Sequence, residues 1–215
     1  MGKQITLQLP FKGSWFVFWG GDTLEQNHHH SDAAQKFALD MIILDKDGKS
    51  HSGLGTNNED YYAFGSDILA PADGKVIEAV DGLRDNTPQK TTNDYAYGGN
   101  YVMIKHAVGV YSTLQHLRCD SVKVKAGQSV KTGQKLGKCG NSGNSSEPHL
   151  HFHLMDDKIL TTYGKNYNRT PQAKGIKAYF DVAAWENETP QYKTHYAPVK
   201  GDIISQPDSA PSRTS

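Results

Sequence analysis

Eight residues of the sequence, EPHLHFHL at positions 147–154, alternate histidine with apolar side chains. Successive side chains of a β-strand point to opposite faces, so the period along one face is two residues. The pattern therefore predicts a strand whose apolar residues face a core. The three histidines would share the opposite face, which is either a solvated sheet surface or a functional site: His149, His151 and His153.

The rest of the chain also favours a β-rich fold. There are 21 glycines in 215 residues, and turn signals recur between short apolar runs. NYVMIKHAVGVYSTLQHL, at 100–117, predicts a β-hairpin that turns at residues 107–109. Two segments, APADGKVIEAV and VKAGQSVKTGQKLGKCG, place glycine turns beside short valine-rich strands. We expect one domain over residues 1–204, followed by a polar, disordered tail at 205–215.

Charge and hydropathy exclude several classes of protein. The 23 Lys and Arg residues balance the 23 Asp and Glu residues, which argues against a nucleic-acid-binding protein. No apolar run approaches the roughly 18 residues of a membrane span. The first residues, MGKQITLQLPFKG, do not have the pattern of a secretory signal peptide, so the protein is cytoplasmic or the sequence begins after a removed signal.

We expect a monomer. Cys119 and Cys139 leave open a disulfide or two free thiols.

A carboxylate in an apolar strand points to a metal site. Asp40 lies within FALDMIIL, and a carboxylate buried there costs several kcal/mol unless something compensates its charge. A metal ion is one such compensation, whereas a hydrogen-bonded structural aspartate or an exposed edge position are the alternatives. Histidine nitrogen and aspartate oxygen are ligands of zinc, and a catalytic site uses three protein ligands. The helical His-Glu-x-x-His pattern is absent from the sequence.

Several segments together resemble the lysostaphin-type zinc metalloendopeptidases, which hydrolyse peptidoglycan. The resemblance runs in order from about Gly20 to His153 and includes SDILAPADGKVIEAV, STLQHL, VKVKAGQSVKTGQKLG and GNSGNSSEPHLHFHL. It implies folded-over antiparallel sheets, similar to a duplicated hybrid-motif barrel sandwich, with loops at 22–35 and 83–99 walling a groove. It also implies a zinc cofactor, bacterial cell-wall peptides as substrates and an extracytoplasmic location, either periplasmic or secreted.

The resemblance assigns roles to individual residues. Asp40 and His151 would be zinc ligands, and His116 and His149 would be catalytic histidines beside the metal. At the position of His153 the family more often has an acidic or amide residue. We interpret His153 as a residue behind the ligands or at the rim of the site.

The third zinc ligand would be a histidine upstream of Asp40. The family's common His-x-x-x-Asp spacing fails, since position 36 is lysine, but NHHHSDAAQKFALD fits a longer form that begins Asn-x-His. That form selects His29. Neighbouring side chains of an extended segment also point in opposite directions, so His28 and His30 would face away from the metal. These two histidines remain the rival choices.

The function implied is zinc-dependent hydrolysis of peptide bonds in peptidoglycan stem peptides or cross-bridges. Zinc would polarise the scissile carbonyl, and His116 and His149 would move a proton or stabilise the oxyanion. The alternative is a catalytically inactive peptidoglycan-binding or regulatory module of the same fold. A biotinyl- or lipoyl-carrier domain fits less well, because no modifiable lysine stands at a predicted hairpin tip.

Overall fold

The computed structural model describes residues 5, 7–158, 173–186 and 189–207. Two short 3-10 helices, η1 (His28–Ser31) and η2 (Asn58–Asp60), are the helices of this part of the chain. No helix within it is long and apolar enough to cross a membrane. The strands are β1 (Trp15–Trp19), β2 (Leu39–Ile42), β3 (Asp67–Leu69), β4 (Gly74–Val80), β5 (Asn100–Ala107), β6 (Val110–Leu117), β7 (Ser129–Val130), β8 (Lys135–Lys138), β9 (Leu150–Met155), β10 (Gly175–Ile176), β11 (Phe180–Glu186), β12 (Thr189–Tyr196) and β13 (Ile203–Ser205).

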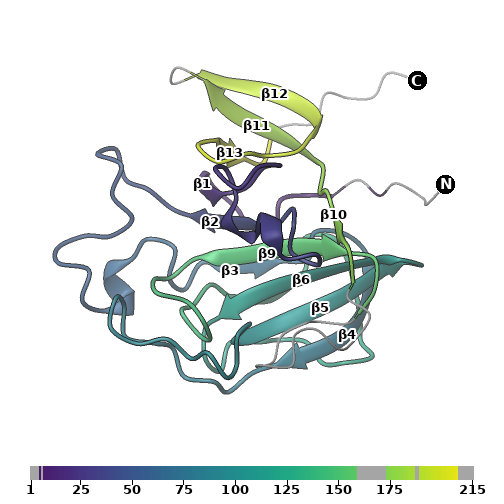
Figure 1. Cartoon of the computed structure of the whole chain (residues 1–215), viewed down its shortest axis with the longest axis horizontal. Helices are drawn as coiled ribbons and strands as arrows, with labels where there is room; N and C mark the ends of the chain where they lie inside the picture. The colour runs from purple at the N-terminus through teal and green to yellow at the C-terminus, as the bar shows by residue number, and fades with distance from the viewer. Residues whose placement is uncertain (1–4, 6, 159–172, 187–188, 208–215) are drawn as a thin grey trace.

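The strands form two antiparallel sheets (Figure 1). The large sheet has the order β12-β11-β13-β1-β2-β9-β6-β5-β4-β7, with β10 added beside β9, and β3 pairs with β8 in a small second sheet. The predicted hairpin is present, because β5 pairs with β6 across a turn at residues 108–109. The expectation of a β-rich fold built from antiparallel sheets is confirmed.

Strand β9 is the predicted histidine strand, and it lies in the interior of the large sheet between β2 and β6. Every residue of β9 is buried, so none of its polar side chains is exposed to solvent. Leu150 and Phe152 belong to the core, as the alternation predicts. On the opposite face His151 and His153 are buried and His149 is half-buried, so that face is not a solvated sheet surface.

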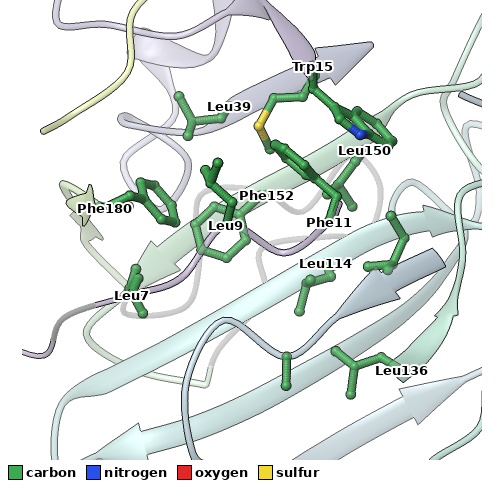
Figure 2. Packing of buried hydrophobic residues seen from close by; sticks show 14 of the residues in the cluster. Leu7, Leu9, Phe11, Trp15, Leu39, Leu114, Leu136, Leu150, Phe152 and Phe180 are labelled. Carbon is green, nitrogen blue, oxygen red and sulfur yellow. The ribbon is translucent and has the colours of Figure 1, made fainter. Parts of the chain in front are cut away.

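The core lies on the apolar face of β9 (Figure 2). Leu114 of β6 packs beside Phe152, and the rings of Phe152 and Phe180 lie 5.8 Å apart. The N-terminal segment crosses this layer and adds Phe11 and Trp15, which stack with their ring centroids 4.6 Å apart. Burial of these large side chains, at about 1.5–3 kcal/mol each, fixes the strand that delivers the histidines.

The remaining expectations concern the ends of the chain and the cysteines. The strands β11 and β12 form a hairpin that extends the large sheet on the side of β1, and β13 ends at Ser205 (Figure 1). Most of the expected tail lies outside the described residues, since 208–215 are not among them. Cys119 and Cys139 are both free thiols, and Cys139 is buried in the core.

Candidate metal centre

The register between β2 and β9 places a carboxylate beside an imidazole. Asp40 is the direct cross-strand partner of His151, and directly paired side chains of an antiparallel sheet lie on the same face. Nδ1 of His151 lies 2.8 Å from Oδ1 of Asp40. Both residues are buried. Two residues that are 111 positions apart in the chain therefore supply a nitrogen and an oxygen donor to one point.

A third donor comes from η1. Nε2 of His29 lies 2.9 Å from Oδ2 of Asp40, the second oxygen of the same carboxylate. Asn27 holds this turn in place: its side-chain oxygen accepts the backbone N–H of His29, and its amide donates to the carbonyls of Gly21, Lys36 and Ala38. The side chain of Asn27 is fully buried. It is the helix cap that a loop needs in order to present one side chain reproducibly.

His28 departs from the expectation drawn from an extended segment. The three histidines stand in a 3-10 turn, where side chains do not alternate between two faces, so this part of the prediction is wrong. Nε2 of His28 lies 3.5 Å from Oδ2 of Asp40 and 2.8 Å from Nε2 of His29. His28, His29 and Asp40 together form a group that is able to hold a metal ion. His28 is much the more exposed of the two histidines, with 55% of its side chain accessible against 12% for His29.

Asp40 sets the electrostatics of the centre. Burial by itself would raise the pKa of the Asp40 carboxyl, but His29 and His151 hold the pKa well below its usual value. Burial would lower the pKa of His29, yet the neighbouring Asp40 raises it above the ordinary histidine value. For His151 burial prevails and lowers the pKa to about 4. A charged carboxylate thus faces a neutral imidazole, as a cation ligand pair requires.

His116 reaches the same region through an irregular strand. Its backbone φ is +61°, and the pairing of β5 with β6 shifts register over residues 114–117. A regular strand would point the side chain of His116 away from that of Gln115, which is the direct partner of His151. With this bulge the ring centroid of His116 lies 5.8 Å from that of His151. Bulges and left-handed residues of this kind occur often beside active sites.

The backbone of the GNSGNSSEP loop orients two histidines. Nδ1 of His116 lies 2.8 Å from the carbonyl of Ser142, and Nδ1 of His149 lies 2.8 Å from the carbonyl of Glu147. A carbonyl only accepts, so both Nδ1 atoms carry a hydrogen and both Nε2 atoms have a lone pair when the rings are neutral. Burial holds the pKa of His116 well below its usual value, which keeps its ring neutral. Nε2 of His149 lies 3.8 Å from Oδ1 of Asp40.

All five predicted site residues line one cavity of about 240 Å³. Both loops that we expected to wall a groove contribute to it, with His28 and Gln35 from the first and Thr92 and Tyr97 from the second. Phe18 and Trp19 add an aromatic wall, and the ring of Trp19 stacks on His28 at 5.0 Å. The sequence did not predict this wall, although WFVFWG is the most aromatic stretch of the chain.

His153 lies behind the donors and not at the rim. Its Nδ1 is 2.8 Å from Nε2 of His151, and it is about 1% exposed. Its Nε2 has no hydrogen-bond partner among the described residues. Of the two interpretations given to this residue, the structure supports a place behind the ligand.

The fold and the site together define a class: β-rich proteins in which histidines and a buried aspartate form a candidate metal site. Comparison with known families identifies the family: the model of peptidase family M23 matches residues 49–163. Because the match spans more than half of the chain, this protein belongs to peptidase family M23, as the resemblance implied. The match contains His116, His149 and His151 but begins after Asp40, and the pairing of β2 with β9 places Asp40 beside the histidine strand.

Individual relatives are peptidoglycan endopeptidases by name. The chain is 36% identical over 161 residues to the peptidoglycan DD-endopeptidase ShyA of Vibrio cholerae, covering 72% of this chain and 33% of ShyA. It is 32% identical over 178 residues to the glycyl-glycine endopeptidase ALE-1 of Staphylococcus capitis, covering 73% of this chain and 46% of ALE-1. This sequence therefore spans a third to a half of these relatives. The catalytic domain of lysostaphin from Staphylococcus simulans is 22% identical, with a TM-score of 0.41 over 72% of this chain and 87% of that one.

Proposed function

We propose that this protein is a zinc-dependent endopeptidase that hydrolyses peptide bonds in the stem peptides or cross-bridges of bacterial peptidoglycan. One observation supports this most strongly. The two oxygens of a buried carboxylate, Asp40, each face an imidazole nitrogen, one from His29 at 2.9 Å and one from His151 at 2.8 Å. Two nitrogens and a carboxylate are the ligands of a catalytic zinc site that keeps one position open.

The residues present fit zinc on chemical grounds. Imidazole nitrogen suits zinc, and a site of oxygen donors alone would suit magnesium or calcium instead. His29, Asp40 and His151 would hold the ion. When bound, zinc supplies a Lewis acid for the scissile carbonyl and lowers the pKa of a water molecule toward about 7.

His116 and His149 would act on the substrate. Both rings are fixed by a hydrogen bond from Nδ1 to a backbone carbonyl, and both present Nε2. A neutral Nε2 accepts a proton from the attacking water, and a protonated Nε2 donates to the developing oxyanion or to the leaving amine. The names of ShyA and ALE-1 support peptidoglycan as the substrate. That substrate lies outside the cytoplasm, so the proposal includes an extracytoplasmic location. We also propose that the protein acts as a monomer.

Mass spectrometry of muropeptides tests this proposal. Purified protein is incubated with peptidoglycan that has direct cross-links and with peptidoglycan that has glycine bridges. We expect a new amino terminus in one of the two, loss of that product with a chelator, and recovery with zinc. Zinc binding without cleavage of either substrate would instead support the inactive binding module.

A further inference from the structure

The two ring nitrogens of His151 have different neighbours. Nδ1 lies 2.8 Å from Asp40, and Nε2 lies 2.8 Å from Nδ1 of His153. The rings of His151 and His153 are nearly perpendicular, at 78°, and both residues are about 1% exposed. The three side chains therefore form a continuous row that runs from the candidate metal centre into the interior.

The contact between the two histidines holds a single proton. A histidine that binds a metal ion is neutral, and a neutral imidazole has one N–H and one lone pair. If Nε2 of His151 donates, its Nδ1 has a lone pair that faces the metal centre. If Nδ1 of His153 donates instead, Nδ1 of His151 carries the hydrogen and points it at Asp40. Only the first arrangement allows His151 to bind a metal ion through Nδ1.

We propose that His153 is a positioning residue: its Nδ1 accepts the Nε2–H of His151 and so holds His151 in the tautomer that binds zinc through Nδ1. This inference rests on the proposed function, because it takes His151 as a zinc ligand. Metal-bound histidines generally donate their second N–H to a carboxylate, a carbonyl or water. In this protein a second imidazole accepts that hydrogen bond.

The hydrogen bonding of His153 argues against a role in packing alone. Its Nε2 is buried without a partner among the described residues. An unsatisfied buried group costs about 1–3 kcal/mol, and leucine or phenylalanine would fill the same space without that cost. The one hydrogen bond that His153 makes in the described part of the chain is directed at His151. A residue retained for shape would not need it.

Three variants at this position separate hydrogen bonding from packing. His153→Asn places an amide oxygen near the position of Nδ1, His153→Gln places it about one bond further out, and His153→Leu removes it. His106→Leu is the control, because His106 is also a hydrogen-bonded histidine in the sheet, but its partners are the backbone carbonyl of Asp73 and the hydroxyl of Ser112, away from the cavity. Zinc affinity is measured by competition with a chromophoric chelator, and the visible spectrum of the cobalt-loaded protein reports the ligand geometry.

We expect His153→Leu and His153→Gln to lower zinc affinity about 10- to 100-fold, the usual effect of losing a group that orients a ligand. His153→Asn and His106→Leu should retain the affinity and the cobalt spectrum of the wild-type protein. Wild-type affinity in His153→Leu, or an affinity of His153→Asn as low as that of His153→Gln, would overturn the inference. If His153→Leu does not fold, the comparison of Asn with Gln still decides. Failure of the wild-type protein to bind zinc would refute the proposed function itself.

Discussion

Asp40 is the residue on which the candidate centre depends, because it compensates several imidazoles at once. His29, His151 and His28 lie 2.9, 2.8 and 3.5 Å from its oxygens. Several histidine rings can pack around one buried carboxylate if the rings are neutral and bind a cation, or if only a few of them are protonated. The difference in exposure between His28 and His29 leads to a prediction about which of them binds.

His29→Ala should lose zinc and His28→Ala should retain it. The side chain of His29 is mostly buried and Asn27 holds the backbone N–H of this residue, whereas more than half of the His28 side chain is exposed. Loss of a ligand should weaken zinc binding by more than the roughly 100-fold limit typical of residues that only orient a ligand. Zinc per protein, measured by atomic emission after dialysis, checks this. Retention of zinc in His29→Ala together with its loss in His28→Ala would exchange the two assignments.

His116→Ala and His149→Ala should keep zinc yet lose activity. Neither Nε2 is needed to hold the ion in our assignment, and a group that transfers a proton contributes about 10²- to 10⁴-fold to the rate. Initial rates of muropeptide release and zinc content are measured on the same preparations. An equal loss of zinc in His149→Ala and His151→Ala would show that His149 is a ligand.

At the scale of elements, local pattern predicted the strands but not the irregular pieces between them. The alternation around His151 and the apolar run around Asp40 are periodic signals, and both strands formed where they were expected. The 3-10 turn that brings His28 to Asp40 has no such period. The bulge at His116 depends on its pairing with β5 and on the carbonyl of Ser142, contacts that are distant in sequence. Sequence patterns do not encode such contacts directly.

Two loops that enclose the cavity meet at a pair of glycines, and this contact should be sensitive to one methyl group. A Cβ on Gly143 would lie 2.3 Å from the backbone nitrogen of Gly99. Gly143→Ala should therefore displace the neighbouring Ser142 carbonyl and with it the ring of His116. We expect a loss of about 1–3 kcal/mol from overpacking, added to about 1–2 kcal/mol for the positive φ.

Gly133→Ala is the matched control. Gly133 also has a positive φ, at +76°, but a Cβ there would meet nothing within 4 Å. It should cost only the conformational part and leave hydrolysis unchanged. Urea unfolding and muropeptide release are compared for the two variants. Equal effects on stability and activity would show that the glycine contact does not position His116.

At the scale of the whole molecule, the large sheet joins segments from both ends of the chain around β9. The pairing of β1 with β13 and of β11 with β13 brings residues near 204 beside the N-terminal strand. Local sequence pattern does not predict these partners, because strand pairing over such distances depends on the complete core. The candidate centre is therefore a property of the folded sheet, since β2 and β9 meet only within it.

Buried neutral histidines should make the metal-free protein less stable in acid. Burial lowers the pKa of His106, His116, His151 and His153 in the folded state. Below about pH 6.5 these histidines bind protons in the unfolded chain but stay neutral in the folded chain. The free energy of unfolding therefore falls as the pH falls from about 6.5 towards 4. The raised pKa of His29 adds stability that is already fully present below about pH 6.5, so it does not offset this loss. Urea unfolding of chelator-treated protein at pH 7, 6, 5 and 4 measures this, and a free energy of unfolding that is constant or rises towards pH 4 would contradict it.

Anomalous diffraction at the zinc edge from a crystal of the zinc-loaded protein tests the central claim most directly. We predict one anomalous peak about 2.0–2.2 Å from Nε2 of His29, an oxygen of Asp40 and Nδ1 of His151. Nε2 of His151 should then remain in hydrogen-bond contact with His153. A peak bound through other residues, or no peak at the Asp40 carboxylate in zinc-saturated crystals, would contradict the account.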